Sequence, residues 1–144
     1  MPAVIGMGKA AELAKAALPQ MSRVAAQRDR LEREILSRID QTAVNGRTDA
    51  RLPNTTHIGF ARLEAEAILL LLSEQSIAAS AGAACSSGSL EPSHVLRAMK
   101  IDPKIAHGAI RFSLSRYTTD AEIDRTLEVL PGVITRLRAV LPVG

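Results

Sequence analysis

Two kinds of pattern along the chain separate predicted helices from predicted strands. Apolar residues three or four positions apart share one face of a helix, and this spacing is clear in residues 19–39 and 123–141. This spacing predicts helices over 19–39 and from Thr119 to about 141. Helices are also predicted over the alanine-rich segment 7–18, the strongly apolar segment 64–74 and the segment 93–99. Strands are predicted over 42–44, 54–60, 76–80 and 109–115, and the last alternates apolar and polar residues most regularly.

The order of these elements predicts an α/β fold of the α+β type, with a small mixed or antiparallel sheet covered by helices mainly on one face. The turn at Asn45–Gly46 favours some antiparallel pairing. The length of 144 residues is that of a single domain, residues 1–144. Thr119 and Glu122 form a capping box for the last helix, which Pro131 should kink or divide.

Composition narrows the classes of function. The net charge is only +3, and the basic residues of 28–34 alternate with acidic ones, which favours a solvated helix face over a nucleic-acid interface. The longest apolar run, 67–72, is too short to cross a membrane, and no secretory signal precedes it. One cysteine cannot form an internal disulfide. We therefore expect a cytoplasmic protein without nucleic-acid or membrane partners, and predict no metal site.

The single cysteine, Cys85, lies in a run of small residues, 81–89. Such a run has little to bury, so we expect an accessible loop that presents the thiol for reaction. A thiol attacks as its thiolate, which requires positive charge or a helix end nearby. The alternative is a buried cysteine that acts as a small hydrophobe, which is the commoner state of a lone cysteine.

Arg111 is the second candidate for a functional residue, after Cys85. Alternation in 109–115 places its side chain on the face opposite Ile110 and Phe112. An arginine on a rigid strand can hold a carboxylate through two parallel hydrogen bonds. The commoner alternative is an arginine that simply covers the solvated face of a sheet.

Three ordered motifs resemble the C-terminal region of cysteine desulfurases of the NifS/IscS kind. They are ACSSGS (84–89), EPSHVL (91–96) and IRFSLSRYTT (110–119), and segments 6–14 and 52–55 are also similar. The resemblance extends from about Val4 to Leu141, and the nitrogen-fixation (NifS) branch is the most similar. These are pyridoxal-phosphate enzymes of the class V aminotransferase group, so the resemblance implies the C-terminal domain of a fold-type I enzyme.

The resemblance also implies roles. Cys85 would attack the sulfur of L-cysteine and carry it as a persulfide, leaving alanine, and Arg111 would hold the substrate carboxylate. The sulfur acceptor would be an iron–sulfur scaffold protein, and the intact enzyme would be a homodimer. Asn54 and His57 are interpreted as structural, and His94 and His107 as surface or supporting groups. Ser115 stands where many relatives have glycine.

One element of the family is not found. The lysine that binds pyridoxal phosphate follows a Ser-x-His motif in the family, and none of Lys9, Lys15, Lys100 and Lys104 follows a histidine. The chain is therefore predicted to lack the cofactor-lysine domain, to bind no cofactor alone and to be inactive without that domain or a second subunit. The alternatives are a non-catalytic sulfur-carrier or scaffold-docking domain and a cysteine hydrolase with His94 as base.

Overall fold

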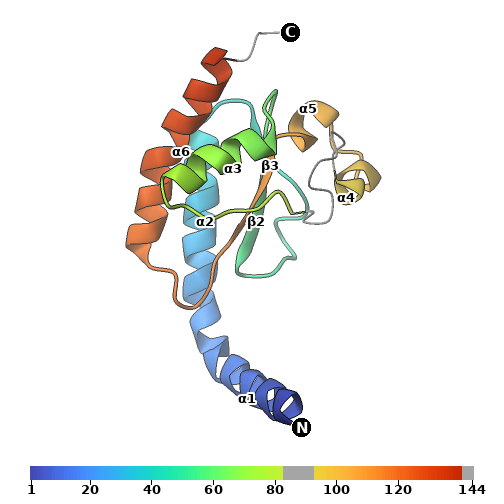
Figure 1. Ribbon diagram of the computed structural model, residues 1–144, viewed down its shortest axis with the longest axis vertical. Coiled ribbons are helices and arrows are strands. Elements are labelled where there is room, and N and C mark those ends of the chain that lie inside the picture. Colours follow the sequence, from blue (N-terminus) through green and yellow to red (C-terminus); the bar gives the residue numbers. More distant parts are fainter. Residues whose placement is uncertain (83–92, 141–144) are drawn as a thin grey trace.

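The computed structural model describes residues 1–82 and 93–140 (Figure 1). Its elements follow in the order α1 (Pro2–Ala17), the 3₁₀ turn η1 (Leu18–Gln20), α2 (Met21–Arg38), β1 (Thr42–Val44), β2 (Thr55–Phe60), α3 (Ala65–Glu74), α4 (His94–Ala98), α5 (Pro103–Ala106), β3 (Ala109–Ser113) and α6 (Asp120–Val140).

The three strands form one antiparallel sheet in the order β1-β2-β3. Ile58 and Phe60 of β2 and Ile110 of β3 are completely buried beneath α2, α3 and α6, which cover one face of the sheet (Figure 1). The short α5 lies against the opposite face, where Ile105 packs on Gly59. The predicted α/β class is confirmed, and within the described residues all strand pairing is antiparallel.

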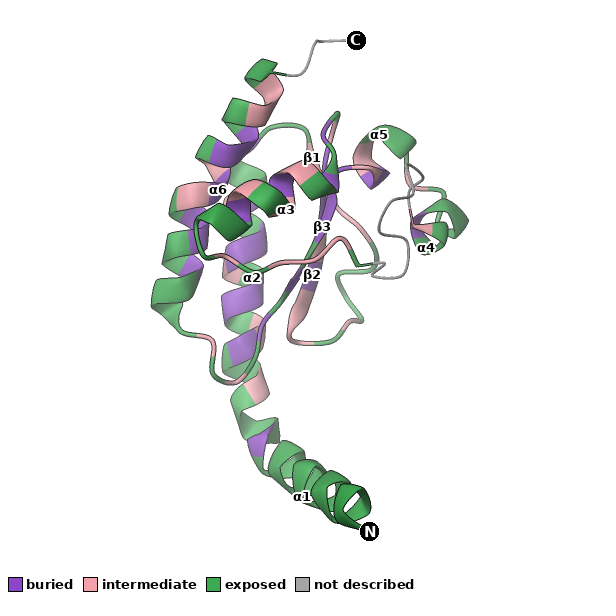
Figure 2. Ribbon diagram, viewed as in Figure 1, coloured by how far each residue is buried: buried purple, intermediate pink, exposed green. Residues whose placement is uncertain are grey.

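The core is built from aliphatic side chains of helices that follow the predicted spacing. Leu31 and Ile35 of α2, Leu72 of α3, and Leu130 and Ile134 of α6 are almost inaccessible to solvent. Figure 2 shows these buried positions as stripes on the faces of α2 and α6 that meet the sheet. The amphipathic helices therefore hold the sheet rigid from one side, and the part of the other face that α5 does not cover can carry polar residues.

The predicted strand over 76–80 is wrong. Ser76 has a positive φ of 59°, which turns the backbone, and only Ser80 pairs with the sheet, through Arg111 of β3. The segment therefore pairs with the edge of β3 at one residue. Helix α5 was not predicted; Asp102 caps it by accepting a hydrogen bond from the Lys104 backbone at 2.9 Å.

Pro131 does not divide the last helix, because α6 continues without a break from Asp120 to Val140. A proline has no N–H to donate to the carbonyl four residues earlier, here that of Leu127. The Arg38 guanidinium donates to this Leu127 carbonyl at 3.5 Å. The interaction between α2 and α6 thus replaces the hydrogen bond that the proline removes. The predicted capping box is present, since Thr119 and Glu122 bond each other's backbone N–H groups at 2.7 and 3.3 Å.

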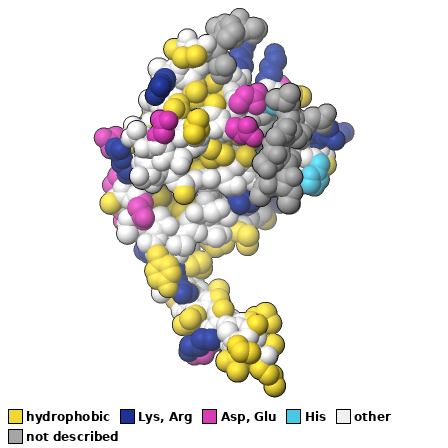
Figure 3. All heavy atoms as spheres, in the orientation of Figure 1, with side chains coloured by type: hydrophobic (Ala, Val, Ile, Leu, Met, Phe, Trp, Pro, Cys, Tyr) yellow, Lys and Arg dark blue, Asp and Glu magenta, His cyan; other side chains and the backbone are white. Residues whose placement is uncertain are grey.

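Helix α1 projects away from the rest of the molecule (Figure 1). Of its residues only Ala17 is buried. The side chains of Val4, Ile5 and Met7 on it are at least 65% exposed, and Figure 3 shows apolar side chains gathered at the end of the projection.

Candidate functional site

Four polar residues lie in a row across the sheet, on the face opposite α2 and α6. Arg111 of β3 is paired with His57 of β2, and Asn45 continues the β1–β2 ladder by donating its backbone N–H to the His57 carbonyl at 2.8 Å. On the other side of Arg111, Ser80 exchanges two backbone hydrogen bonds with it, at 2.6 and 3.2 Å. Directly opposed residues project to the same face of a sheet. We call Asn45, His57, Arg111 and Ser80 the polar row.

The middle pair of this row is especially close. Arg111 uses its backbone N–H and C=O on Ser80, and His57 uses its carbonyl on Asn45. The His57–Arg111 pair is therefore of the type without mutual backbone hydrogen bonds, in which the two Cα atoms are only about 4.5 Å apart. Their side chains consequently share one small area of the sheet surface.

Arg111 is exposed on its strand, as the alternation predicted. Within residues 1–82 and 93–140, its guanidinium has no hydrogen-bond or ion-pair partner. Arg51, by contrast, binds Glu32 through both terminal nitrogens at 2.5 and 2.9 Å. In the described part of the chain Arg111 is thus a cation without a partner on a rigid strand, which is the arrangement that binds a carboxylate or another oxyanion.

The imidazole of His57 is held in one orientation. Its Nδ1 lies 3.3 Å from Nδ2 of Asn45. An amide nitrogen only donates, so Nδ1 accepts and the proton of the neutral ring is on Nε2. Burial, and then the positive charge of Arg111, lower the pKa of His57. A Cβ added at Gly82 would lie 3.7 Å from Nε2, so this nitrogen faces the point where the chain enters the cysteine segment.

Cys85 and the first part of the EPSHVL motif fall within residues 83–92, outside the described residues. The last described residue before them, Gly82, has a φ of 87° and donates its N–H to Oγ of Ser80 at 3.0 Å. Two described residues, Ala81 and Gly82, therefore separate the polar row from the segment 83–92 that contains Cys85.

The other residues singled out in the sequence lie apart from the polar row. The Asn54 side chain donates to the Leu114 carbonyl at 3.3 Å and joins the ends of two strands. His94 is exposed at the start of α4, and Nδ1 of His107 lies 3.7 Å from a Glu64 carboxylate oxygen. The Ser115 hydroxyl accepts a hydrogen bond from the Tyr117 backbone at 3.1 Å, which orders the turn before α6.

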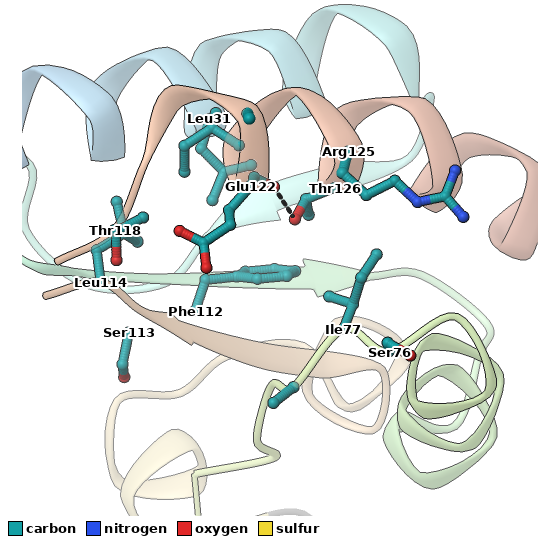
Figure 4. Close-up of a pocket in the computed structure, with 13 residues that line it drawn as sticks. Leu31, Ser76, Ile77, Phe112, Ser113, Leu114, Thr118, Glu122, Arg125 and Thr126 are labelled. Atoms are coloured by element: carbon teal, nitrogen blue, oxygen red, sulfur yellow. Dashed lines mark hydrogen bonds between the residues drawn. The ribbon is translucent and has the colours of Figure 1, made fainter.

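A pocket of about 450 Å³ opens beside β3, between the segment 76–78 and the first turns of α6 (Figure 4). Its walls are mostly apolar, and its charged residues have partners: Glu122 bonds Thr119 at 2.7 Å, and Arg125 bonds Gln75 at 3.1 Å. Neither His57 nor Arg111 lines it. The polar row therefore has the stronger chemical case as the candidate site.

The described residues form neither a metal centre nor a complete cofactor site. Among them, no group of three or more histidine, cysteine or acidic side chains could hold a metal ion. Lys9 and Lys15 lie on the projecting helix α1, where Lys9 bonds Glu12 at 3.0 Å, and Lys100 and Lys104 lie beside α4 and in α5. No lysine belongs to the polar row, so these residues do not fit pyridoxal phosphate by themselves.

Residues 1–126 match the class-V aminotransferase family. The chain belongs to that family. It is 57% identical over 142 residues to cysteine desulfurase 2 of Trichormus variabilis, covering 99% of this chain and 36% of that protein. It is 55% identical over 143 residues to the cysteine desulfurase of Gluconacetobacter diazotrophicus, with the same coverage of both chains.

Solved structures agree with this assignment. A NifS-like protein superposes with a TM-score of 0.80 at 27% identity, over 94% of this chain and 34% of the other. A second, the NifS-like protein of Rickettsia africae, superposes with a TM-score of 0.67 over 80% of this chain. The chain thus spans about a third of the length of the family members it matches. Among the described residues, no helix has the length and apolar character needed to cross a membrane.

Proposed function

We propose that this chain is the part of a cysteine desulfurase that supplies the nucleophile, Cys85, and the substrate clamp, Arg111. The observation that carries the proposal is the 57% identity to a cysteine desulfurase over 99% of the chain. The guanidinium of Arg111, which has no partner among the described residues, supports it independently, because a free amino acid brings a carboxylate that such a group binds.

The reaction conserves atoms and electrons without an added oxidant. The Cys85 thiolate attacks the sulfur of L-cysteine, a sulfur–sulfur bond forms, and the carbon–sulfur bond of the substrate breaks. The carbon gains a proton to give L-alanine, and Cys85 carries the persulfide. Pyridoxal phosphate, held by residues outside this chain, withdraws electrons from the substrate in the intact enzyme. An iron–sulfur scaffold protein in the cytoplasm then takes the sulfur.

Arg111 contributes orientation. A planar guanidinium binds both oxygens of a carboxylate, which fixes the direction in which the rest of the substrate extends. Because β3 is held by β2 on one side and by Ser80 on the other, this direction is fixed by the sheet. Small errors in the position of a reacting group lower the reaction rate strongly, so a rigid strand is a suitable support for this contact.

The test joins this chain to a cofactor domain. In a chimera, residues 1–144 replace the matching part of the Trichormus variabilis desulfurase, and alanine release and protein-bound persulfide are measured. Arg111→Lys should lower kcat/KM about 10- to 100-fold, since a hydrogen bond to a charged group is worth roughly 1.5–3 kcal/mol. Cys85→Ser should abolish persulfide while cysteine still binds. Arg33→Lys, on the exposed face of α2, is the matched control and should change neither value.

Release of persulfide from Cys85→Ser, or an unchanged kcat/KM in Arg111→Lys, would remove the role given to that residue. A chimera that releases no alanine, together with a chain that accepts persulfide sulfur from another desulfurase, would favour a non-catalytic sulfur carrier instead. The chain alone should release no alanine from cysteine, because its described lysines lie apart from the polar row.

A further inference from the structure

We propose that His57 is a second ligand for the carboxylate bound by Arg111, to which it donates a hydrogen bond from Nε2. The inference deepens the proposed function and rests on it, because it requires Arg111 to bind the carboxylate of the substrate. His57 acts here as a positioning residue that sets the orientation of that carboxylate.

The first argument is proximity. His57 and Arg111 are directly opposed on β2 and β3, in the closely spaced type of pair. Side chains of such a pair have Cβ atoms about 4.5–5.5 Å apart and extend from the same face. A group bound at the Arg111 guanidinium is therefore next to the imidazole ring.

The second argument is the state of the ring. The Asn45 amide donates to Nδ1 at 3.3 Å, which leaves Nε2 as the protonated nitrogen. Within residues 1–82 and 93–140, no acceptor bonds this Nε2. The ring is partly buried, and burial together with the Arg111 charge lowers the pKa of His57, so the ring is neutral and keeps this tautomer at neutral pH.

The third argument is the number of hydrogen bonds that a carboxylate can accept. A carboxylate has about four acceptor positions, and a two-point contact with arginine uses two of them. One remaining position can accept from Nε2. A neutral donor suits this position because it adds a hydrogen bond without a second positive charge beside Arg111, whose field already disfavours protonation of the ring.

The interaction can be measured on the chain itself by nuclear magnetic resonance at pH 7.5. The ring nitrogens of ¹⁵N-labelled protein report the tautomer, and the probe is L-alanine, which carries the carboxylate and lacks the reactive sulfur. Alaninamide, which lacks the carboxylate, is the control ligand. We expect the Nε2–H tautomer at His57, and parallel shifts of His57 Nε2 and Arg111 Nε on titration with L-alanine but not with alaninamide.

Three variants complete the design. His57→Phe keeps a ring but loses the donor and should weaken L-alanine binding about three- to tenfold, up to the equivalent of one hydrogen bond. His57→Gln can place an amide N–H near the position of Nε2 and should restore most of the affinity. His94→Phe, an exposed histidine on α4, should leave the affinity unchanged.

The outcomes separate the two proposals. Saturable shifts at Arg111 with no shift at His57 Nε2, or equal affinity in His57→Phe and the unmodified chain, overturn the role of His57 and leave Arg111 as the clamp. An Nδ1–H tautomer in the free chain also overturns it, without reference to any variant. No shift at Arg111 with L-alanine removes the carboxylate clamp, and with it both the proposed function of Arg111 and this inference.

Discussion

Gly108 connects α5 to β3, and its replacement by alanine tests how tightly the loop after β2 is packed against this connection. Its backbone carbonyl accepts from the Phe60 N–H at 3.1 Å. A Cβ at residue 108 would overlap the Phe60 carbonyl oxygen and lie 2.9 Å from the carbonyl oxygen of Leu63. Both obstacles are backbone atoms of buried residues, so no flexible side chain can move aside.

The backbone angle of Gly108 is one that alanine adopts, so the overlap alone decides the result. Overpacking of a well-packed interior costs about 1–3 kcal/mol, and because backbone must move we expect about 3 kcal/mol. A chain of this size loses about 2–4 °C of melting temperature for each kcal/mol of destabilisation. A loss of about 3 kcal/mol in Gly108→Ala should therefore lower the melting temperature by roughly 10 °C. The assay is urea and thermal unfolding followed by circular dichroism at 222 nm.

The matched control is the same substitution at Gly132, in the exposed part of α6, where an added Cβ meets nothing within 4 Å. Alanine favours a helix over glycine by about 0.5–1 kcal/mol, so Gly132→Ala should stabilise the protein. The two variants should therefore have effects of opposite sign. A Gly108→Ala protein as stable as the unmodified chain would refute the packing argument, as would a Gly132→Ala protein that is the less stable of the two.

Three further predictions concern stability. Burial raises the pKa of Glu32, but hydrogen bonds and charges, those of Arg51 foremost, outweigh burial and hold the pKa below its ordinary value of 4.5. The stabilisation of the fold by ionised Glu32 is therefore complete above pH 4.5 and is lost as the pH falls through the lower pKa of the folded state. Glu32→Gln should remove this loss and flatten the acid side of a plot of urea midpoint against pH. Thr119→Ala removes the hydroxyl that accepts from the Glu122 N–H at the start of α6. The substitution should lower the free energy of unfolding in urea by about 1 kcal/mol. Leu130→Ala, at a completely buried position, should cost about 2–5 kcal/mol, and a smaller loss would show that the core around α6 rearranges.

Local patterns were sufficient for most of the helices and strands and for the direction of the Arg111 side chain. Strict alternation in 109–115 predicted both β3 and the outward direction of Arg111, because the period of a strand is a property of the backbone itself. The capping box of α6 was predicted from two residues, since its hydrogen bonds join groups three positions apart. Such features depend only on neighbours in the sequence.

The polar row could not be predicted in the same way. His57 was interpreted as structural because its partner Arg111 is 54 positions away, and the register that joins them is fixed by the packing of the whole sheet. The segment 76–80 was predicted as a strand, yet Ser76 has a positive φ and only Ser80 of the segment pairs with β3. Helix α5 has four residues, too few for an apolar period to appear.

The projecting helix α1 should unfold locally at a much lower free energy than the rest of the molecule. With only Ala17 buried, α1 contributes little apolar burial to the fold, and its 16 residues are near the minimum length of about 12–15 at which a helix persists in water. Gly6 and Gly8 weaken it further. Its amides can therefore open and exchange with solvent while the sheet and α2, α3 and α6 stay closed. A denaturation curve of this chain consequently reports the unfolding of the sheet and of α2, α3 and α6. Whether α1 stays helical depends on its own contacts and is measured separately, by hydrogen exchange of its amides.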